Sequence, residues 1–166
     1  GTPTSELIFN MAGGIRDDNK LKAFIPGGSS ANILTADKVD VPYDYEAIAE
    51  AGSMLGSGAL IVMDHTVNIV EAALRMTYFY MHESCGKCTP CREGTRWMYQ
   101  ILSDIQDGKG SNKQIEKLED ICDNMSFKCF CALGDAAVAP VASSIMHFRS
   151  DYDELIKKME GGAVTA

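Results

Sequence analysis

The sequence lacks a long hydrophobic run. Its longest apolar stretch, Ala59 to Met63, falls far short of the roughly 20 residues that a membrane-spanning helix needs. A secretory signal, with its basic start and small-residue cleavage site, is also missing from the sequence. We therefore expect no direct membrane insertion, and any membrane association would come through a partner.

Basic residues are in the minority. Lys and Arg total 15 against 23 Asp and Glu, which gives a formal net charge of -8. A nucleic-acid surface needs Lys and Arg gathered on one face, so this balance argues against nucleic-acid binding. The sequence also contains no Ser/His/Asp set, paired catalytic carboxylates or metalloprotease motif, so hydrolytic chemistry has no support.

The sequence is rich in cysteine. The chain has six cysteines among 166 residues, and three of them, Cys85, Cys88 and Cys91, fall within seven residues. Disulfide frameworks of secreted domains usually spread their cysteines out, and this chain has no secretory signal. We therefore expect a reducing compartment, free thiols and a metal or cluster site.

The first third of the chain predicts a small mixed α/β piece. A helical pattern runs from Glu6 to Met11, a strand is expected at Leu21–Ile25, a short helix at 45–51, and a second strand at 59–63. Two strands make a marginal sheet with bare edges. We therefore expect missing sheet partners upstream, and this chain to be the C-terminal part of a longer protein.

From about Thr66 the pattern becomes that of long amphipathic helices. The first helix shows apolar residues at three- and four-residue steps, and the second, 91–107, should end before Gly108. The inward residues expected are Ile69, Val70, Ala73, Leu74, Tyr78 and Met81 in the first helix, and Trp97, Ile101, Leu102 and Ile105 in the second.

Three further helical segments complete the expected bundle. Ser111 followed by Gln114 is a capping-box signature for a helix through Ile121. Another helix should follow Cys131, with Asp135 as a possible cap, and a short piece should cover 152–159. The predicted fold class is α+β, with a small domain at residues 1–64 and a mainly α four- to five-helix bundle at 65–166.

The strongest chemical signal is a C-x2-C-x2-C loop between two predicted helices. Three thiolates at this spacing suit one corner of a 4Fe-4S cluster, and the basic side chains nearby would offset negative charge. The loop and its basic neighbours are Cys85, Cys88, Cys91, Lys87, Arg92 and Arg96.

A 4Fe-4S cluster needs a fourth ligand, and three cysteines remain. Cys131 precedes a helix pattern, where a thiolate gains from helix N-terminal amides, so it is the best candidate. Cys129 lies two residues earlier, and Cys122 sits among apolar helix residues, which is typical of a core thiol. Zinc is the rival: two of the trio with Cys129 and Cys131 would make a four-thiolate site but would leave Cys91 without a role.

With these motifs in view, the chain resembles the NADH-binding flavoprotein subunit of respiratory complex I (NADH-quinone oxidoreductase). The resemblance is carried by two segments, Glu83-Ser84-Cys85-Gly86-Lys87-Cys88-Thr89-Pro90-Cys91-Arg92-Glu93-Gly94 and Phe130-Cys131-Ala132-Leu133-Gly134-Asp135. The first part of the chain, with Gly1-Thr2-Pro3 and Pro26-Gly27-Gly28, resembles the family's β-grasp (SLBB-like) middle domain, here partial. The rest resembles its iron-sulfur helical bundle.

The resemblance implies that Cys85, Cys88, Cys91 and Cys131 are the ligands of one 4Fe-4S cluster. The family's fourth ligand directly precedes the Ala-Leu-Gly-Asp run, which favours Cys131 and leaves Cys129 as an extra thiol with room for ligand exchange. The cluster would accept electrons from the FMN of an NADH-oxidising subunit. The family's FMN- and NADH-binding domain is absent from these residues, so this chain alone is not expected to be catalytic.

The resemblance also implies partners and a location. The partners would be other subunits of the hydrophilic arm, including a 2Fe-2S subunit and a larger iron-sulfur subunit. The expected location is cytoplasmic, on the peripheral arm at the inner membrane if the complex is complex I. The same module occurs in NAD-linked hydrogenases and formate dehydrogenases, and the sequence does not separate these settings.

Overall fold

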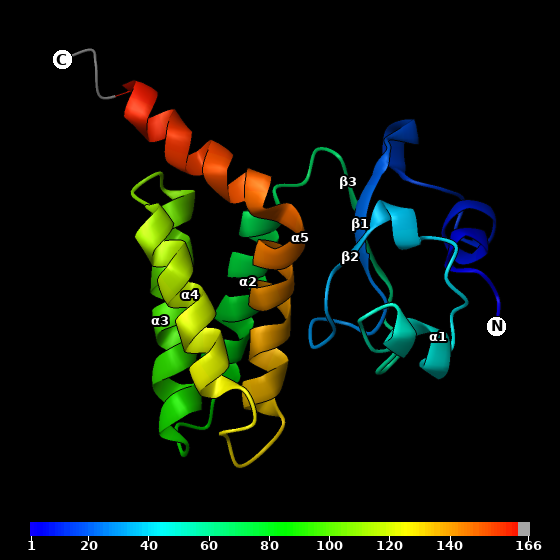
Figure 1. The fold of residues 1–166 in the computed structure, drawn as a ribbon. Coiled ribbons are helices and arrows are strands. Elements are labelled where there is room, and N and C mark those ends of the chain that lie inside the picture. The colour runs from blue at the N-terminus through cyan, green and yellow to red at the C-terminus, as the bar shows by residue number, and fades with distance from the viewer. Residues whose placement is uncertain (163–166) are drawn as a thin grey trace. The chain divides into compact units, whose positions relative to one another are not determined.

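A computed structural model describes residues 1–162 of the chain. The chain divides into two compact units, one formed by Gly1–Val67 and the other beginning at Asn68. Figure 1 shows the three strands in the first unit and the four long helices in the second.

The first unit is built on a three-stranded antiparallel sheet. Its strands are β1 (Leu21–Ile25), β2 (Leu34–Thr35) and β3 (Ile61–Asp64), in the order β2-β1-β3. The prediction of β1 is confirmed residue for residue. The prediction of only two strands is wrong: β2 is two residues long, too short to show an alternating pattern, and it pairs through Phe24 opposite Leu34.

Short helices complete this unit. They are a π-helical turn at Glu6–Met11, 3-10 turns at Arg16–Asp18 and Ala36–Lys38, and α1 at Tyr45–Glu50. Helix α1 begins after Asp44, whose carboxylate accepts a hydrogen bond from the Ala47 N–H at 2.8 Å. The helices expected at the first and last of these segments are therefore present.

The turn after β1 requires glycine. A Cβ on Gly27 would lie 2.2 Å from the carbonyl oxygen of Met54, so only a residue without a side chain fits against that backbone. Gly56 approaches the same segment from the other side, with a φ of 51°. This close approach explains why glycine is needed in the Pro26-Gly27-Gly28 segment, and it agrees with the interpretation of the segment as a turn.

The second unit is a bundle of four helices. They are α2 (Ile69–Glu83), α3 (Thr89–Gln106), α4 (Asn112–Met125) and α5 (Leu133–Gly162). Helix α5 is broken by a kink at Phe148, where φ is -131° and ψ is 37°, and the separate helix expected at 152–159 lies in the part of α5 that follows this kink. Among the described residues, none of these helices combines the length and apolar character needed to cross a membrane.

The bundle core is continuous and apolar. All four helices contribute to it, and Met98, Leu102 and Tyr152 have no exposed surface. The Tyr152 hydroxyl shares a hydrogen bond with Ser144 Oγ at 2.6 Å, which satisfies the polar tip of this buried ring. Further core members are Val70, Ala73, Ile105, Ile115, Leu118, Cys122, Met125, Val141 and Ile145.

Two aromatic residues lie on a different face from the one predicted. Tyr78 and Trp97 are expected inside from the pattern, but each is 51% exposed, whereas Tyr80 and Met98 are buried in their place. Both lie at the edge of the apolar stripe of their helix, where one residue step of about 100° decides between core and surface.

The predicted helix caps differ in detail. Helix α4 does begin after Ser111, but the Ser111 hydroxyl contacts the Gln114 side chain at 3.2 Å and caps no backbone N–H. Asp135 lies inside α5, and its carboxylate accepts a hydrogen bond from the Phe127 N–H at 2.6 Å. Asp135 therefore closes the loop before the helix, which is a different task from the expected cap.

Candidate iron-sulfur site

Two loops lie at the same end of the bundle. Residues 84–88 connect α2 to α3, and residues 126–132 connect α4 to α5 (Figure 1). These loops and the first turn of α3 contain Cys85, Cys88, Cys91, Cys129 and Cys131, which are five of the six cysteines. The fold thus gathers cysteines that are far apart in sequence into one region.

The first loop places its three cysteines at increasing depth. Cys85 is exposed, Cys88 is half-buried at the position before α3, and Cys91 is buried in the first turn. Pro90 also lies in this turn, where its missing N–H costs no hydrogen bond.

Polar contacts hold this loop in shape. Arg92 donates a hydrogen bond to the carbonyl of Gly86, a residue with a φ of 76°. Ser84 Oγ lies 3.2 Å from Cys91 Sγ and accepts a longer bond from the Gly86 N–H at 3.4 Å. The predicted place of Arg92 beside the cysteines is confirmed, since its guanidinium spans the loop that contains two of them.

Two backbone N–H groups of the second loop donate hydrogen bonds that fix its position. The Phe127 backbone has a φ of 56°, and its N–H donates to Asp135, eight residues along the chain. The Phe130 N–H donates to Cys88 Sγ at 3.2 Å, a contact between residues 42 apart in sequence. This last bond joins the two cysteine loops directly.

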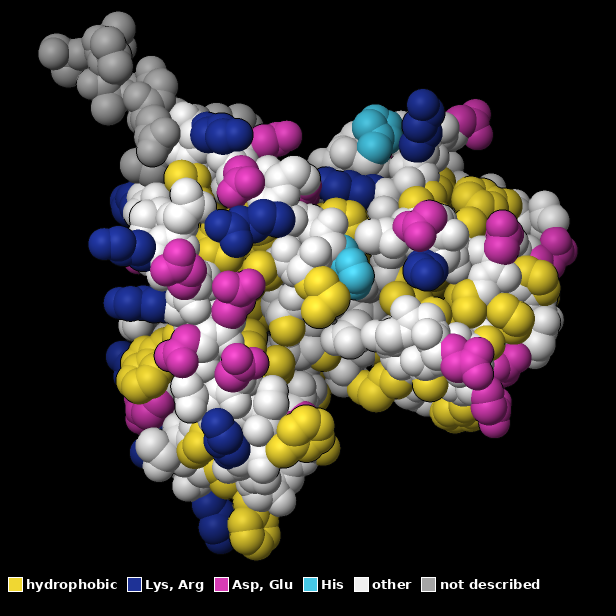
Figure 2. Space-filling model, in the orientation of Figure 1, with side chains coloured by type: hydrophobic (Ala, Val, Ile, Leu, Met, Phe, Trp, Pro, Cys, Tyr) yellow, Lys and Arg dark blue, Asp and Glu magenta, His cyan; other side chains and the backbone are white. Residues whose placement is uncertain are grey.

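Exposed aromatic side chains accompany the second loop. Phe127 is 92% exposed and Phe130 is 90% exposed, and the Lys87 ammonium lies 5.8 Å from the Phe130 ring centre. Figure 2 shows hydrophobic side chains beside Lys or Arg side chains at this end of the bundle.

The two cysteines of the second loop differ in placement. Cys131 is exposed, whereas Cys129 is half-buried. A Cβ on Gly134 would lie 2.4 Å from Cys129 Sγ and 3.8 Å from Cys91 Cβ, so both side chains pack against this glycine. Burial, followed by the nearby Cys91 and Cys88, raises the pKa of the Cys129 thiol.

Cys122 is separate from the other five cysteines. It is 3% exposed, and its thiol lies 3.7 Å from Met98 Sδ inside the core. Burial, reinforced by Asp123 and Glu119, raises the pKa of this thiol to about 12. The prediction of Cys122 as a core thiol is confirmed.

The donor chemistry suits an iron-sulfur cluster, although the ligands are not fully drawn together. Among the described residues, no three His, Cys, Asp or Glu side chains converge closely enough, as they stand, to hold a metal ion. Five thiols at one end of the bundle nevertheless supply more than the four that such a cluster uses. His82, the histidine nearest to the loop in sequence, pairs with Glu83 at 3.0 Å on the surface.

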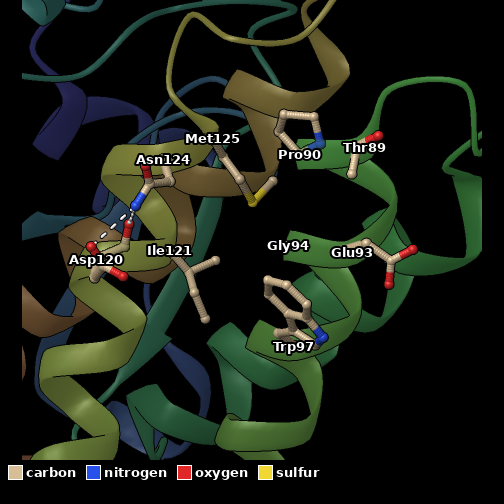
Figure 3. A pocket seen from close by; sticks show the side chains of 9 residues that line it. All are labelled: Thr89, Pro90, Glu93, Gly94, Trp97, Asp120, Ile121, Asn124 and Met125. Atoms are coloured by element: carbon tan, nitrogen blue, oxygen red, sulfur yellow. Dashed lines mark hydrogen bonds between the residues drawn. The ribbon is translucent and has the colours of Figure 1, made fainter.

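A pocket of about 280 Å³ lies beside the cysteine loop, between α3 and α4. Pro90, Gly94 and Trp97 line one side, and Ile121 and Met125 line the other (Figure 3). A Cβ on Gly94 would fall 2.3 Å from Met125 Sδ, so this glycine sets how closely the two helices approach. Sequence reasoning missed the pocket because it treated Trp97 as a core residue.

Sequence reasoning also missed the contacts that position the second loop. Gly134 and Asp135 stand in the recognised Ala-Leu-Gly-Asp run, yet the pattern alone does not reveal that one makes room for Cys129 and the other holds Phe127. These tasks depend on tertiary contacts, for which a single sequence gives no periodic signal.

Comparison with known proteins places the chain in context. The family described as "NADH-ubiquinone oxidoreductase-F iron-sulfur binding region" matches residues 71–155. The F subunit of NADH-quinone oxidoreductase from Streptomyces coelicolor is 52% identical over 153 residues, 92% of this chain and 34% of that protein. Its counterpart from Rickettsia typhi is 44% identical over 95% of this chain and 38% of its own length. This chain therefore spans about a third of the relatives that it matches.

Solved structures agree with the fold. A crystal structure of an NAD+-reducing [NiFe]-hydrogenase in the air-oxidised state matches 94% of this chain and 26% of the hydrogenase chain, with a TM-score of 0.82 and 25% sequence identity. The predicted α+β class is confirmed by this match and by the elements described above. With its helical bundle matched by the family description, the chain belongs to the family of NADH-ubiquinone oxidoreductase-F iron-sulfur binding regions.

Proposed function

We propose that this chain holds one 4Fe-4S cluster on Cys85, Cys88, Cys91 and Cys131 and carries electrons within an NADH-oxidising complex. The observation that carries the proposal is the gathering of five cysteines at one end of the bundle while Cys122 is sealed in the core. The family description, which names an iron-sulfur binding region, supports the same chemistry. When bound, such a cluster takes up and releases one electron at a time.

The chain's own groups tune the site. The guanidinium of Arg92 and the ammonium of Lys87 lie on the cysteine loops and offset the negative charge of four thiolates. The Phe130 N–H donates to Cys88 Sγ, and hydrogen bonds to ligand sulfur are one of the means by which proteins adjust cluster potential. The exposed face with Phe127 and Phe130 gives the cluster region a surface for a neighbouring protein part.

The rest of the proposal concerns the longer protein. In this proposal, residues 1–64 form a partial β-grasp (SLBB-like) domain and residues 65–166 form the cluster domain. In the parent protein an FMN would pass electrons from NADH to this cluster, and a 2Fe-2S subunit and a larger iron-sulfur subunit would be partners. A place on the cytoplasmic side of the inner membrane, in the peripheral arm, follows from this assignment to complex I.

A hydrogenase context is the second candidate. It is favoured by the match to the NAD+-reducing [NiFe]-hydrogenase, which covers nearly all of this chain. The cluster chemistry is the same in both candidates, and the partners differ. Purification of the native complex and identification of its other subunits would separate them.

The test is a metal analysis of anaerobically purified protein. We expect about four irons and four acid-labile sulfides per chain, with a cubane-type EPR signal after reduction by dithionite. NADH alone should not reduce the cluster in this chain, because the proposal places the NADH site elsewhere. Stoichiometric zinc without sulfide, together with failed reconstitution by iron and sulfide, would contradict the proposal and favour a zinc-stabilised interaction module.

A further inference from the structure

Cys129 is the one cysteine of the site that the proposed ligand set leaves unused, yet its side chain packs beside that of Cys91 against Gly134. We propose that the loop at 126–132 offers two alternative fourth ligands, so that Cys129 takes the place of Cys131 on the cluster. The inference rests on the proposed function, and it adds a ligand that the family motif does not assign.

The first support is position. The side chains of Cys129 and Cys91 pack against the same small surface, the α-carbon of Gly134, which has no Cβ to keep them away. The backbone of the neighbouring residue, Phe130, already donates to Cys88 Sγ. Cys129 is therefore beside two of the three motif cysteines before any cluster is considered.

The second support is the way in which the loop is held. The Phe127 N–H is bound to Asp135 and the Phe130 N–H to Cys88, so contacts on both sides of Cys129 fix the loop at the cysteine end. Cys131 follows immediately and is exposed. Exchanging which thiol faces the motif requires a backbone change at Phe130, which shifts the hydrogen bond between Phe130 and Cys88, whereas the bond between Phe127 and Asp135 can remain.

The third support is the contrast with a thiol that is only structural. Cys122 is enclosed by the bundle core, whereas Cys129 is half-buried at the surface of the site. The Cys129 thiol donates to the Met125 carbonyl at 3.9 Å, which is a long and weak hydrogen bond. Little energy is therefore needed to release this thiol for binding.

The exchange balances without a redox partner. The bond between iron and Cys131 Sγ breaks, and a bond between the same iron and Cys129 Sγ forms. Cys129 gives its thiol proton to water as it binds, and Cys131 takes up one proton as it leaves. No electron is gained or lost, so the cluster keeps its oxidation state.

The test compares C131A with the double variant C129A/C131A in anaerobically reconstituted protein. We expect C131A to keep about four irons per chain, with an altered EPR spectrum, because a thiolate still completes the site. The double variant should fall to about three irons or fewer, since only three cysteine ligands remain. Equal loss of iron in both variants would overturn the inference.

Thiol alkylation gives a second measurement that does not depend on activity. In loaded wild-type protein, iodoacetamide should label Cys129 and spare Cys131. In loaded C131A, Cys129 should be protected, and mass spectrometry of the peptides should show the change. Labelling of Cys129 in loaded C131A at the wild-type rate would show that another group holds the iron.

A third test changes the packing around Cys129 and leaves this cysteine in the sequence. In G134A the new Cβ would lie 2.4 Å from Cys129 Sγ, so this thiol must move, whereas Cys91 Cβ at 3.8 Å is at an ordinary contact distance. G134A alone should load normally, whereas G134A/C131A should lose iron as the double cysteine variant does. Circular dichroism of each variant checks that the helices remain.

The outcomes separate this inference from the proposed function. If wild-type protein binds no iron and sulfide, the proposed function fails and no ligand exchange remains to be tested. If wild-type protein loads normally but C131A behaves as the double variant does, the cluster assignment stands and Cys129 is not an alternative ligand.

Discussion

The middle of the bundle and its cysteine end differ in how deeply their side chains are buried. In the middle, Met98, Cys122 and Tyr152 are at most 3% exposed, and the polar tip of Tyr152 finds its partner in Ser144. At the cysteine end, two of the thiols and two phenylalanines are exposed, on loops that are held by a few hydrogen bonds. The stability of the unit is therefore concentrated in the middle and its chemistry at the end, so substitutions in the two regions should have different consequences.

The largest expected effect is at the cysteine end. Cys91→Ala should abolish the 4Fe-4S cluster, because it removes the most deeply placed ligand of the motif. Iron and sulfide analysis after reconstitution measures this loss. Cys122→Ala is the matched control and should keep about four irons. If Cys91→Ala also retained them, the cluster would not require Cys91.

The next largest effect should be a loss of stability caused by a substitution in the middle of the bundle. Met98→Ala removes a fully buried side chain that contacts Cys122, and a cavity of this kind costs about 2–5 kcal/mol of unfolding free energy. Urea denaturation of the cluster-free protein, followed by circular dichroism, measures the change. A loss below about 0.5 kcal/mol would mean that the bundle middle is not the tightly packed region described above.

A smaller effect should appear in the pH dependence of the free energy of unfolding, because the Cys122 thiol is buried in the core. The pKa of Cys122 is raised to about 12 in the folded chain, from an ordinary value of 9.0. Above pH 9 the unfolded chain therefore loses a proton that the folded chain keeps, so this thiol's contribution to stability declines as pH rises from about 9 towards 12. Between pH 8 and pH 10 the decline should be about 1.4 kcal/mol.

Cys122→Ala is the control for this measurement. Urea unfolding at the two pH values should show a decline that is smaller in the variant by the amount due to Cys122. Burial also raises the pKa of Tyr152, with a smaller contribution from Cys122, so part of the decline that remains in the variant comes from Tyr152. An identical decline in both proteins would contradict the raised pKa of the Cys122 thiol.

The smallest effect should come from Trp97→Ala. Trp97 neighbours Met98 in sequence but is half-exposed beside the pocket, so its removal should cost no more than about 1 kcal/mol. Comparison with Met98→Ala in the same urea experiment tests whether the helix face is assigned correctly. A loss as large as that of Met98→Ala would show that Trp97 belongs to the core, as the sequence pattern predicts.

The sequence predicted the bundle better than the site, for a physical reason. Apolar residues recur at helical spacing, so the predicted bounds of α3, 91–107, lie close to the observed Thr89–Gln106, and Cys122 lies in the core as predicted. The errors at Tyr78 and Trp97 arose at the edge of an apolar stripe. The kink at Phe148 lies a few residues before 152, where the sequence predicts the start of a separate last helix.

The loops follow no such periodicity. The motif cysteines could be recognised from their spacing, but the depth of each thiol depends on contacts between distant residues, such as Phe130 with Cys88. The close packing of Cys129 against Gly134 is likewise a tertiary effect. The short strand β2 was missed for a related reason, since two residues are recognised as a strand only through their partner, β1.

The contact between Phe130 and Cys88 spans 42 residues, most of which form α3 and α4. A cluster bound by both loops would act as a cross-link that closes this long segment of chain into a ring. Closing a loop of about 40 residues in the unfolded chain removes conformational entropy worth on the order of 4 kcal/mol. Cluster insertion would then be part of how the bundle keeps its helices paired, and damage to the cluster would loosen the protein as well as interrupt its electron path.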